Sequence, residues 1–289
     1  MAHDLSKGMH WIGHPGSLGP IVDYGMESVQ DDIEMQVSTS MGGGRRVAVS
    51  RTRPARSWSM SIPNAHADDI GHVRTLLAAT LPPYQLVTAH AQVSNVLTPD
   101  RSVWRSLMPG SFALSLAGAW PLEGGGRSTV TALNPSAAFG SQAMVRVGPF
   151  PVPPSWTQRP VTISCYLGTA RPAGTYVTLE WLDAAGVQMG AGVLGNAVTG
   201  MDLLRRSTAT ATPPAGAVAG RIAIPYAEIL ANPQVTWTPA PIQEWSIGEG
   251  ADRVVITGSS LDTDMAVPDR YSLRRGSYSL NLLEMGPMT

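Results

Sequence analysis

The sequence predicts an all-β protein with one short helix near 66–79, of β-sandwich or jelly-roll architecture. Two observations support this prediction. Large apolar residues recur at every second position over short runs, which is the spacing of strands with one buried face. Glycine and proline, 30 and 24 of the 289 residues, separate these runs and mark turns. Many short strands joined by such turns are typical of sandwiches and jelly rolls.

The alternation is clearest in 57–62 (SWSMSI), where large apolar residues alternate with serines. The same period predicts strands near 161–166, 177–182, 222–224, 254–256 and 278–282. Cys165, the lone cysteine, stands at an apolar position of one of these strands, so we expect a buried and inert thiol.

One segment, 66–79, has the spacing of a helix. Its apolar residues lie three and four positions apart, at Ala67, Ile70, Val73 and Leu77. We expect Asn64 to cap its N-terminus and Pro82 to end it, because proline lacks the backbone donor that a helix needs.

The middle of the chain differs in composition from its two ends. Strands rich in Thr, Ser and Ala run from about Asn95 to Glu244, and arginine-bearing strands precede and follow this stretch. The pattern predicts a β domain made of 1–94 together with 246–289, into which 95–245 is inserted as a jelly roll. Three small consecutive domains are the alternative that the sequence leaves open.

Charge excludes two classes of partner. The chain carries 20 Lys and Arg residues against 21 Asp and Glu, a net charge of −1, whereas nucleic acids and anionic membranes are bound by clustered positive charge. No run of about 18 apolar residues is present, and the N-terminal residues lack the pattern of a secretory signal. We therefore expect no nucleic-acid partner and no insertion into a membrane.

Positive charge does gather locally, at Arg45, Arg46, Arg51, Arg53 and Arg56. Such arginines can bind phosphate or flank strands that meet a neighbouring subunit, and we assign them to a subunit interface. Strands over 45–62 and 253–283 would then expose edges that pair between subunits and satisfy their backbone groups.

None of the motifs that carry chemistry predicts an enzyme. Residues 190–195 spell G-x-G-x-x-G, but no helix-forming sequence follows, so we interpret them as a loop between sandwich strands. His10 and His14 are four apart, yet Gly13 and Pro15 prevent the helix that would bring both rings to one metal ion. We interpret these histidines as part of a solvated tail. No catalytic residue, metal site or cofactor is predicted.

Carboxylates are the only candidates for hydrolytic chemistry. Glycoside hydrolysis needs two acidic side chains about 5–10 Å apart across a cleft. The middle of the chain holds four acids that could converge in this way, Glu180, Asp183, Glu228 and Glu244. Surface solubility explains scattered acids equally well, so a hydrolase is the weakest functional alternative.

Tryptophan is unusually frequent, with eight tryptophans against three phenylalanines. Indole rings stack on the apolar faces of sugars, while Arg, Asn and Gln side chains hydrogen-bond to sugar hydroxyls. Trp58 and Trp181 alternate with polar neighbours and are predicted to lie in the core. Four others stand beside loop residues and are predicted to be exposed for carbohydrate binding: Trp104, Trp120, Trp156 and Trp237.

Several stretches resemble minor tail proteins of long-tailed phages that infect actinobacteria. They are 11–16 (WIGHPG), 42–46 (GGGRR) and 56–59 (RSWS), followed by 95–99 (NVLTP), which is similar to the opening of the next module. Residues 276–280 (GSYSL) resemble a closing strand of the tail domain. The resemblance implies a distal-tail-like split barrel with one helix, which assembles into a ring, commonly sixfold.

The middle of the chain resembles jelly rolls of the carbohydrate-binding-module type. The residues that carry this resemblance are 177–186 (VTLEWLDAAG), 212–217 (TPPAGA) and 241–245 (PIQEW). It implies a β-sandwich that binds glycan, without assigning individual sugar-contacting residues.

These observations together predict a non-enzymatic structural protein of a phage tail tip, made in the host cytoplasm. Its expected partners are further copies of itself in a ring, the tail tube, tape measure and hub proteins, and a host cell-wall glycan. A stand-alone glycan-binding protein is the first alternative, and a cell-wall hydrolase is the second.

Overall fold

The computed structural model divides the chain into two compact units. Unit 1 comprises Met1–Ile12, Gly19–Leu86 and Asp252–Thr289, and unit 2 comprises Gly13–Leu18 and Val87–Ala251. The predicted domain boundaries, 94/95 and 245/246, stay a prediction. The residues that the structure describes are 9–22, 27–31, 35–39, 46–50, 56–65, 67–79, 81–105, 115–129, 131–133, 144–154, 157–225, 227–242, 244–265 and 275–285.

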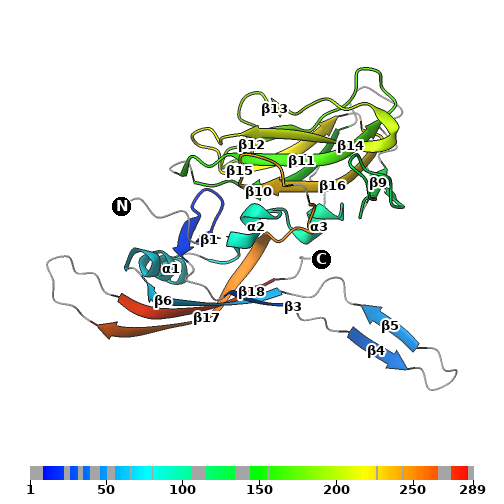
Figure 1. Ribbon diagram of the computed structural model, residues 1–289. Helices are drawn as coiled ribbons and strands as arrows, with labels where there is room; N and C mark the ends of the chain where they lie inside the picture. The colour runs from blue at the N-terminus through cyan, green and yellow to red at the C-terminus, as the bar shows by residue number, and fades with distance from the viewer. Residues whose placement is uncertain are drawn as a thin grey trace. The chain divides into compact units, whose positions relative to one another are not determined.

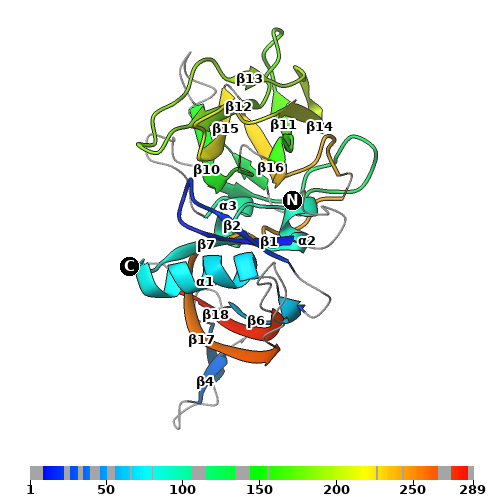
Figure 2. The ribbon, with the colours of Figure 1, turned by 90° about the vertical axis from the view of Figure 1, so that its left-hand side faces the viewer.

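Unit 1 contains a seven-stranded sheet in the order β2-β1-β7-β17-β18-β6-β3. A separate two-stranded sheet pairs β4 with β5. The larger sheet curls around helix α1, so that β1, β2 and β7 lie on one side of the helix and β6, β17 and β18 on the other (Figure 1, Figure 2). It does not close into a barrel: in the described part of the chain, β2 and β3 are its terminal strands. The elements are β1 (Met9–Gly13), β2 (Gly19–Val22), β3 (Glu27–Asp31), β4 (Met35–Thr39), β5 (Arg46–Ser50), β6 (Arg56–Ala65), α1 (Ala67–Ala79), β7 (Tyr84–Val87), β17 (Ala251–Met265) and β18 (Arg275–Glu284).

The predicted helix is confirmed as α1, but with a different buried face. Val73 and Leu76 are buried, whereas Leu77, which the spacing placed on the buried face, is 45 % exposed. The hydroxyl of Tyr84, in β7, donates a hydrogen bond to the carbonyl oxygen of Leu76 at 2.8 Å and holds this side of the last turn against the sheet. Asn64 does not cap the helix, because it lies within β6.

The N-terminal residues form a central strand. All five residues of β1 are buried, His10 among them, and β1 pairs with β2 from Met9↔Val22 to Ile12↔Gly19. The expectation of a solvated tail is therefore wrong. The reason is that β1 lies between β2 and β7, so that the side chain of Trp11 is enclosed in the core of unit 1.

Two of the strands predicted to expose their edges, β6 and β18, are interior strands. β18 pairs with β17 on one side and with β6 on the other. The second edge of β6 is covered by β3, with Glu27 opposite Met60. The prediction of pairing between subunits is therefore wrong for β6 and β18. It stays a prediction for β5, which forms a two-stranded sheet with β4, and for the long β17, whose other neighbour is the four-residue β7.

Unit 2 is a sandwich of two antiparallel sheets (Figure 1). The sheets have the orders β10-β15-β12-β13 and β14-β11-β16-β9-β8. Two short helices precede them, and the sequence did not predict these because each is about one turn long and shows no helical period. The elements are α2 (Ala89–Val93), α3 (Pro99–Ser102), β8 (Ser115–Ala117), β9 (Thr131–Leu133), β10 (Met144–Pro151), β11 (Val161–Thr169), β12 (Thr178–Leu182), β13 (Val193–Leu194), β14 (Gly200–Ala211), β15 (Ala219–Pro225) and β16 (Ile229–Thr236).

Strand β11 shows how alternation builds the sandwich. Ile163 and Cys165 are fully buried on its inner face. Ser207 stands opposite Cys165 on β14, and its hydroxyl accepts a hydrogen bond from the backbone of Val177, in the segment that leads into β12, at 2.9 Å. Ser164 and the residues that share its face therefore point away from the other sheet. The predicted all-β class is confirmed.

Asn95 joins two segments to β16, the one that leads into the sandwich and the one that leaves it. Its side-chain amide donates to the carbonyl oxygens of Pro233, at 3.1 Å, and Ser246, at 3.0 Å. Its side-chain oxygen accepts from the backbone N–H groups of Leu97, at 3.2 Å, and Val235, at 3.1 Å. Asn95 is fully buried, so all four partners depend on this one side chain.

Two glycines allow the same segments to touch. A Cβ atom at Gly248 would collide with the carbonyl oxygen of Leu97, and one at Gly250 would collide with that of Val96. The backbone N–H of Gly250 donates to the Leu97 oxygen at 3.0 Å, and that of Gly248 donates to the Ser102 hydroxyl at 2.8 Å. We call Asn95, Gly248 and Gly250 the clasp.

Removing the clasp side chain should destabilise unit 2. We expect Asn95→Ala to lower the free energy of unfolding by about 2–4 kcal/mol, because buried groups left without partners cost about 1–3 kcal/mol each. Urea denaturation followed by tryptophan fluorescence measures this change. Asn196→Ala is the matched control, since the exposed Asn196 also bridges two backbone groups, which water can satisfy after the change. Equal losses in the two variants would contradict the role assigned to Asn95.

Candidate functional site

The outer face of the five-stranded sheet brings aromatic and charged side chains together. Tyr166, in β11, stands directly opposite Arg206, in β14, and the guanidinium carbon lies 5.8 Å from the centre of the Tyr166 ring. Tyr166 packs against a buried cluster formed by Leu204, Ile229 and Ala231, and three other partly buried apolar side chains pack against the same cluster. We call the following five residues the Tyr166 face: Trp120, Leu122, Tyr166, Met201 and Arg206.

A small hairpin supplies two members of this face. Trp120 and Ser128 are joined by two hydrogen bonds: the Trp120 N–H donates to the Ser128 side-chain hydroxyl at 2.9 Å, and the Ser128 N–H donates to the Trp120 carbonyl at 2.8 Å. The turn between them is made by 124–126, three glycines with positive φ that other residues rarely adopt. The N–H of Leu204 donates to the Pro121 carbonyl at 2.9 Å, which attaches the hairpin to β14.

Arg206 is held by neutral partners. Its Nη2 donates to the Ser164 hydroxyl at 2.9 Å and to the side-chain oxygen of Gln234 at 2.7 Å. The Gln234 amide nitrogen donates in turn to the carbonyl oxygens of Ser94, at 2.9 Å, and Glu244, at 3.1 Å. The guanidinium is half-buried, and this burial lowers the pKa of Arg206 below the usual range of arginine. The arrangement thus fixes a cation beside an aromatic ring.

The tryptophans predicted to bind carbohydrate are in different environments. Trp104 and Trp237 are only 5 % and 4 % exposed, so the prediction that they are exposed is wrong. Trp237 is enclosed because its indole N–H donates to the Pro151 carbonyl at 3.2 Å and its backbone N–H donates to the Gln92 carbonyl. Trp120 is half-buried in the Tyr166 face, and its sugar-binding role stays a prediction. Trp156 lies outside the described residues.

Sequence reasoning missed Tyr166 and Arg206. The available signal was the strand alternation itself. Tyr166 takes the place that Thr162 and Ser164 take earlier in β11, so it had to lie on the outer face. An aromatic residue at a polar position of an alternating strand is the pattern that would have found it.

Most of the arginines assigned to a subunit interface have side chains that the structure does not describe. Arg45, Arg51 and Arg53 lie outside the described residues, and of Arg46 only the backbone, at the start of β5, is described. Arg56 requires a correction, because it is buried and forms a bidentate ion pair within unit 1 instead of facing solvent. Its partner is Glu284 on the neighbouring strand β18, with Nε–Oε2 2.9 Å and Nη2–Oε1 3.0 Å.

The four acids considered for hydrolysis do not share one role. Glu180 is buried and ion-paired, with its Oε2 at 2.5 Å from Nε of Arg221 and 4.0 Å from Nε of Arg146. Asp183 accepts two backbone N–H groups of its own turn at 2.9 Å. Glu228 is half-buried and Glu244 exposed. Glu180 and Asp183 thus serve the local structure of unit 2.

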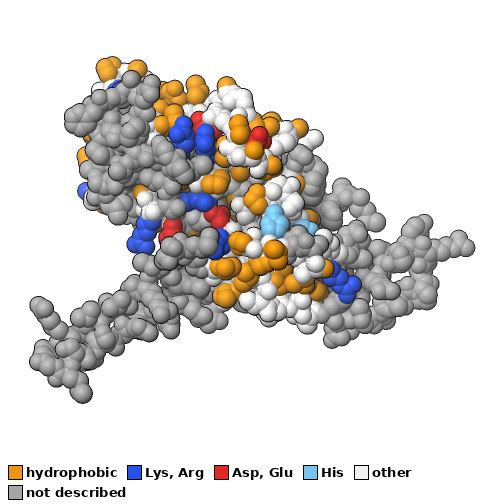
Figure 3. All heavy atoms as spheres, turned by 180° about the vertical axis from the view of Figure 1, so that it is seen from behind, with side chains coloured by type: hydrophobic (Ala, Val, Ile, Leu, Met, Phe, Trp, Pro, Cys, Tyr) orange, Lys and Arg blue, Asp and Glu red, His pale blue; other side chains and the backbone are white. Residues whose placement is uncertain are grey.

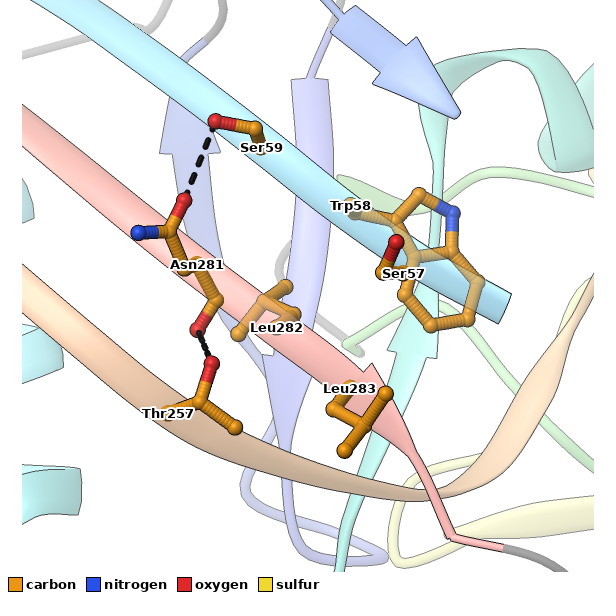
Figure 4. A pocket seen from close by; sticks show the side chains of 7 residues that line it. All are labelled: Ser57, Trp58, Ser59, Thr257, Asn281, Leu282 and Leu283. Atoms are coloured by element: carbon orange, nitrogen blue, oxygen red, sulfur yellow. Dashed lines mark hydrogen bonds between the residues drawn. The ribbon is translucent and has the colours of Figure 1, made fainter. Parts of the chain in front are cut away.

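Unit 1 carries a hollow of about 370 Å³ on its curled sheet (Figure 4). The Ser59 hydroxyl donates to the side-chain oxygen of Asn281 at 3.0 Å, and the Thr257 hydroxyl donates to the Asn281 carbonyl at 3.2 Å. These groups can hydrogen-bond a neutral partner, but no ionisable side chain lines the hollow. Its lining consists of Ser57, Trp58, Ser59, Thr257, Asn281, Leu282 and Leu283.

Charges of both signs are interspersed on the surface shown in Figure 3, where no large patch of one sign is visible among the described residues. The described residues also contain no cluster of three or more His, Cys, Asp or Glu side chains placed to hold a metal ion. Among the same residues, no helix has the length and hydropathy needed to cross a bilayer.

No protein-family model matches this chain, and no curated protein matches its sequence. Among solved structures, the chain is similar to the CBM22-1–GH10 modules of xylanase 10B from Clostridium thermocellum, complexed with xylohexaose (TM-score 0.32, 12 % identity, 53 % of this chain and 30 % of that one). It is also similar to arabinosyltransferase EmbB from Mycobacterium smegmatis (TM-score 0.25, 16 % identity, 38 % and 13 %). A third is the Dit protein of phage SPP1, a hub of the adsorption apparatus (TM-score 0.20, 11 % identity, 76 % and 98 %). This chain thus spans less than a third of the first two proteins, and TM-scores this low carry no argument about function.

The buried thiol gives a direct test of the packing in the sandwich. Burial raises the pKa of Cys165, and its Sγ donates to the Ala231 carbonyl at 3.1 Å. Because the thiolate is the reactive form, we expect no reaction of the native protein with Ellman's reagent at pH 8, and one equivalent after unfolding in guanidinium. Ser59→Cys, at an exposed position, is the positive control. Rapid reaction of native Cys165 would show that the inner face of β11 is open.

Proposed function

We propose that this chain is a non-enzymatic structural protein of a phage tail tip. In this proposal unit 1 joins copies of the chain to one another and to other tail proteins, and unit 2 binds a host cell-wall glycan. The tail assignment rests on the sequence resemblance at 11–16, 42–46 and 56–59. The observation that carries the glycan-binding role is the Tyr166 face.

The Tyr166 face has the chemistry that sugars need. The faces of the Tyr166 and Trp120 rings can stack on the apolar faces of pyranose rings. Arg206 adds N–H donors for hydroxyl oxygens beside the aromatic ring. Ser164 and Gln234 hold Arg206 in place, so little side-chain entropy is lost on binding. Two half-buried aromatic rings and one fixed cation favour the binding of a ligand over catalysis.

Unit 1 offers strand edges for assembly. β2 and β3 end the seven-stranded sheet in the described part of the chain, and β4 pairs with β5 in a sheet of its own. A strand with one free edge presents backbone groups to which another chain can add a strand. A two-stranded sheet is marginally stable by itself, which favours pairing with a neighbour.

Assembly would strengthen a weak glycan site. A site with a millimolar dissociation constant provides only about 4 kcal/mol of binding free energy. When several copies stand on one ring, the later contacts become intramolecular, and the total affinity rises by orders of magnitude. Low affinity at each Tyr166 face is therefore compatible with firm attachment of a virion.

The assembly half of the proposal predicts a discrete oligomer. Light scattering coupled to size exclusion, across micromolar concentrations, should give a mass well above 30.5 kDa. We expect a closed ring, on the order of six subunits, because the tail-protein resemblance implies a sixfold ring and head-to-tail contacts can close into a cyclic assembly. A monomer at every concentration would contradict self-assembly and favour a stand-alone glycan-binding protein.

The glycan-binding half predicts that stacking of sugars on the Tyr166 and Trp120 side chains provides most of the affinity for glycan. We expect Tyr166→Ala and Trp120→Ala each to weaken binding to bacterial cell-wall glycans about tenfold, since each removes a stacking surface. A glycan array, followed by calorimetry on the glycans that bind, measures this loss. Tyr176→Ala is the matched control, because Tyr176 is also half-buried but precedes β12, in the opposite sheet. Unchanged binding by both face variants would remove the Tyr166 face as the site.

A further inference from the structure

Arg206 has binding capacity that the fold does not use. Nη2 makes both of its hydrogen bonds, to Ser164 and to Gln234. Nε is buried without a partner, and Nη1 bonds to none of the described residues. A guanidinium has five N–H donors, so the two on Nη1 remain for a ligand, whereas the Nε–H is enclosed by the protein and out of a ligand's reach.

The charge of Arg206 is also uncompensated in the described part of the chain. No carboxylate there forms an ion pair with it, and both of its partners are neutral. The carboxylate of Glu123 accepts the backbone N–H of Arg206 at 3.4 Å instead. The adjacent Arg205 differs, because its Nη1 lies 3.1 Å from the carboxylate of Asp202. Burial lowers the pKa of Arg206, which is the direction expected for a cation that lacks a counter-charge.

We infer that the glycan bound at the Tyr166 face is an acidic one, whose carboxylate or phosphodiester pairs with Arg206 while a sugar ring stacks beside it on Tyr166. This inference rests on the proposed glycan-binding role of unit 2. A carboxylate or phosphate adds the attraction of opposite charges and a bidentate geometry to the hydrogen bonds that a sugar hydroxyl could also accept from the guanidinium. An anionic group would thus supply the counter-charge and accept hydrogen bonds from Nη1 at once.

Other ligand classes fit the same residues less well. A neutral glycan would use the rings but would leave the charge of Arg206 unpaired. A free inorganic anion would pair with Arg206 but would not use Trp120, Leu122 or Met201, which pack on the same buried cluster as Tyr166. Only an anion attached to an apolar ring face uses both parts of the site.

The test compares ligands that differ only in charge. Calorimetry on the full-length protein would use oligogalacturonate against its neutral methyl ester, and a hyaluronan octasaccharide against its carboxyl-reduced form. Poly(glycerol phosphate) carrying glucosyl substituents, which supply the sugar ring, distinguishes a phosphodiester source from a carboxylate source. We expect at least one anionic ligand to bind about tenfold more tightly than its neutral counterpart, or, for the phosphodiester, than any neutral ligand. Added salt should reduce this preference.

Matched variants assign the preference to one side chain. Arg206→Met should abolish the preference for anionic ligands, and it should also weaken the binding of neutral ones because it removes donors to sugar hydroxyls, so the ratio of the two affinities is the quantity compared. Arg205→Met removes the same charge from the neighbouring position and should keep the preference. Arg206→Lys keeps the charge without the planar fork and should retain part of the preference. Thermal melts of all three variants identify any loss of fold.

The outcomes separate the inference from the function on which it rests. Equal affinity for charged and neutral partners would overturn the acidic-glycan inference and leave glycan binding intact. A preference that survives in a folded Arg206→Met variant would overturn the role of Arg206. If the native protein bound no glycan, charged or neutral, the glycan-binding function itself would fail.

Discussion

The architecture of unit 2 depends on one buried amide. Asn95 bonds to β16 through Pro233 and Val235 and to the closing segment through Ser246, so the chain's entry into the sandwich and its exit are fixed at the same place. Gly248 and Gly250 are required there, because any side chain would collide with the entry segment. A buried amide that uses two donors and two acceptors admits few substitutes, since almost no other side chain offers both at this size.

The Tyr166 face follows from the same constraint. Ser94 precedes the clasp, and its carbonyl oxygen accepts from the amide nitrogen of Gln234 on β16. The other end of the Gln234 amide accepts from Arg206, so the clasp, the central strand and the guanidinium form one chain of hydrogen bonds. The position of the cation is thus set by backbone groups that are distant in sequence and adjacent in the fold. This is why Arg206 can remain half-buried without an acidic partner among the described residues.

In unit 1 the sequence predicted the positions of the strands and the helix better than it predicted which strands lie next to each other. The alternation of Trp58 and Met60 with serines placed β6 correctly, and the helical spacing placed α1 to within a residue of its start. The same patterns did not show that β1 lies between β2 and β7, or that β17, β18 and β6 are interior strands. Periodicity reports which face of a strand is buried, whereas strand order is decided by pairings across long sequence separations. Arg56 illustrates the consequence: its pairing with Glu284 depends on β6 and β18 being adjacent, which no local pattern specifies.

The sequence by itself determined the all-β class, the single longer helix, the buried thiol at Cys165 and the absence of a net charge that could attract nucleic acid. These are local or additive properties, since they follow from residue spacing and from sums over the chain. Only the tertiary structure decided which aromatic rings remain accessible, placing Trp120 and Tyr166 on one buried cluster and enclosing Trp104 and Trp237. It also decided which hydrogen-bond donors of Arg56 and Arg206 are paired, because the partners of both side chains come from strands far away in the sequence. Whether a side chain is accessible or paired with a charge depends on the residues that face it in the fold, and strand order determines which residues those are.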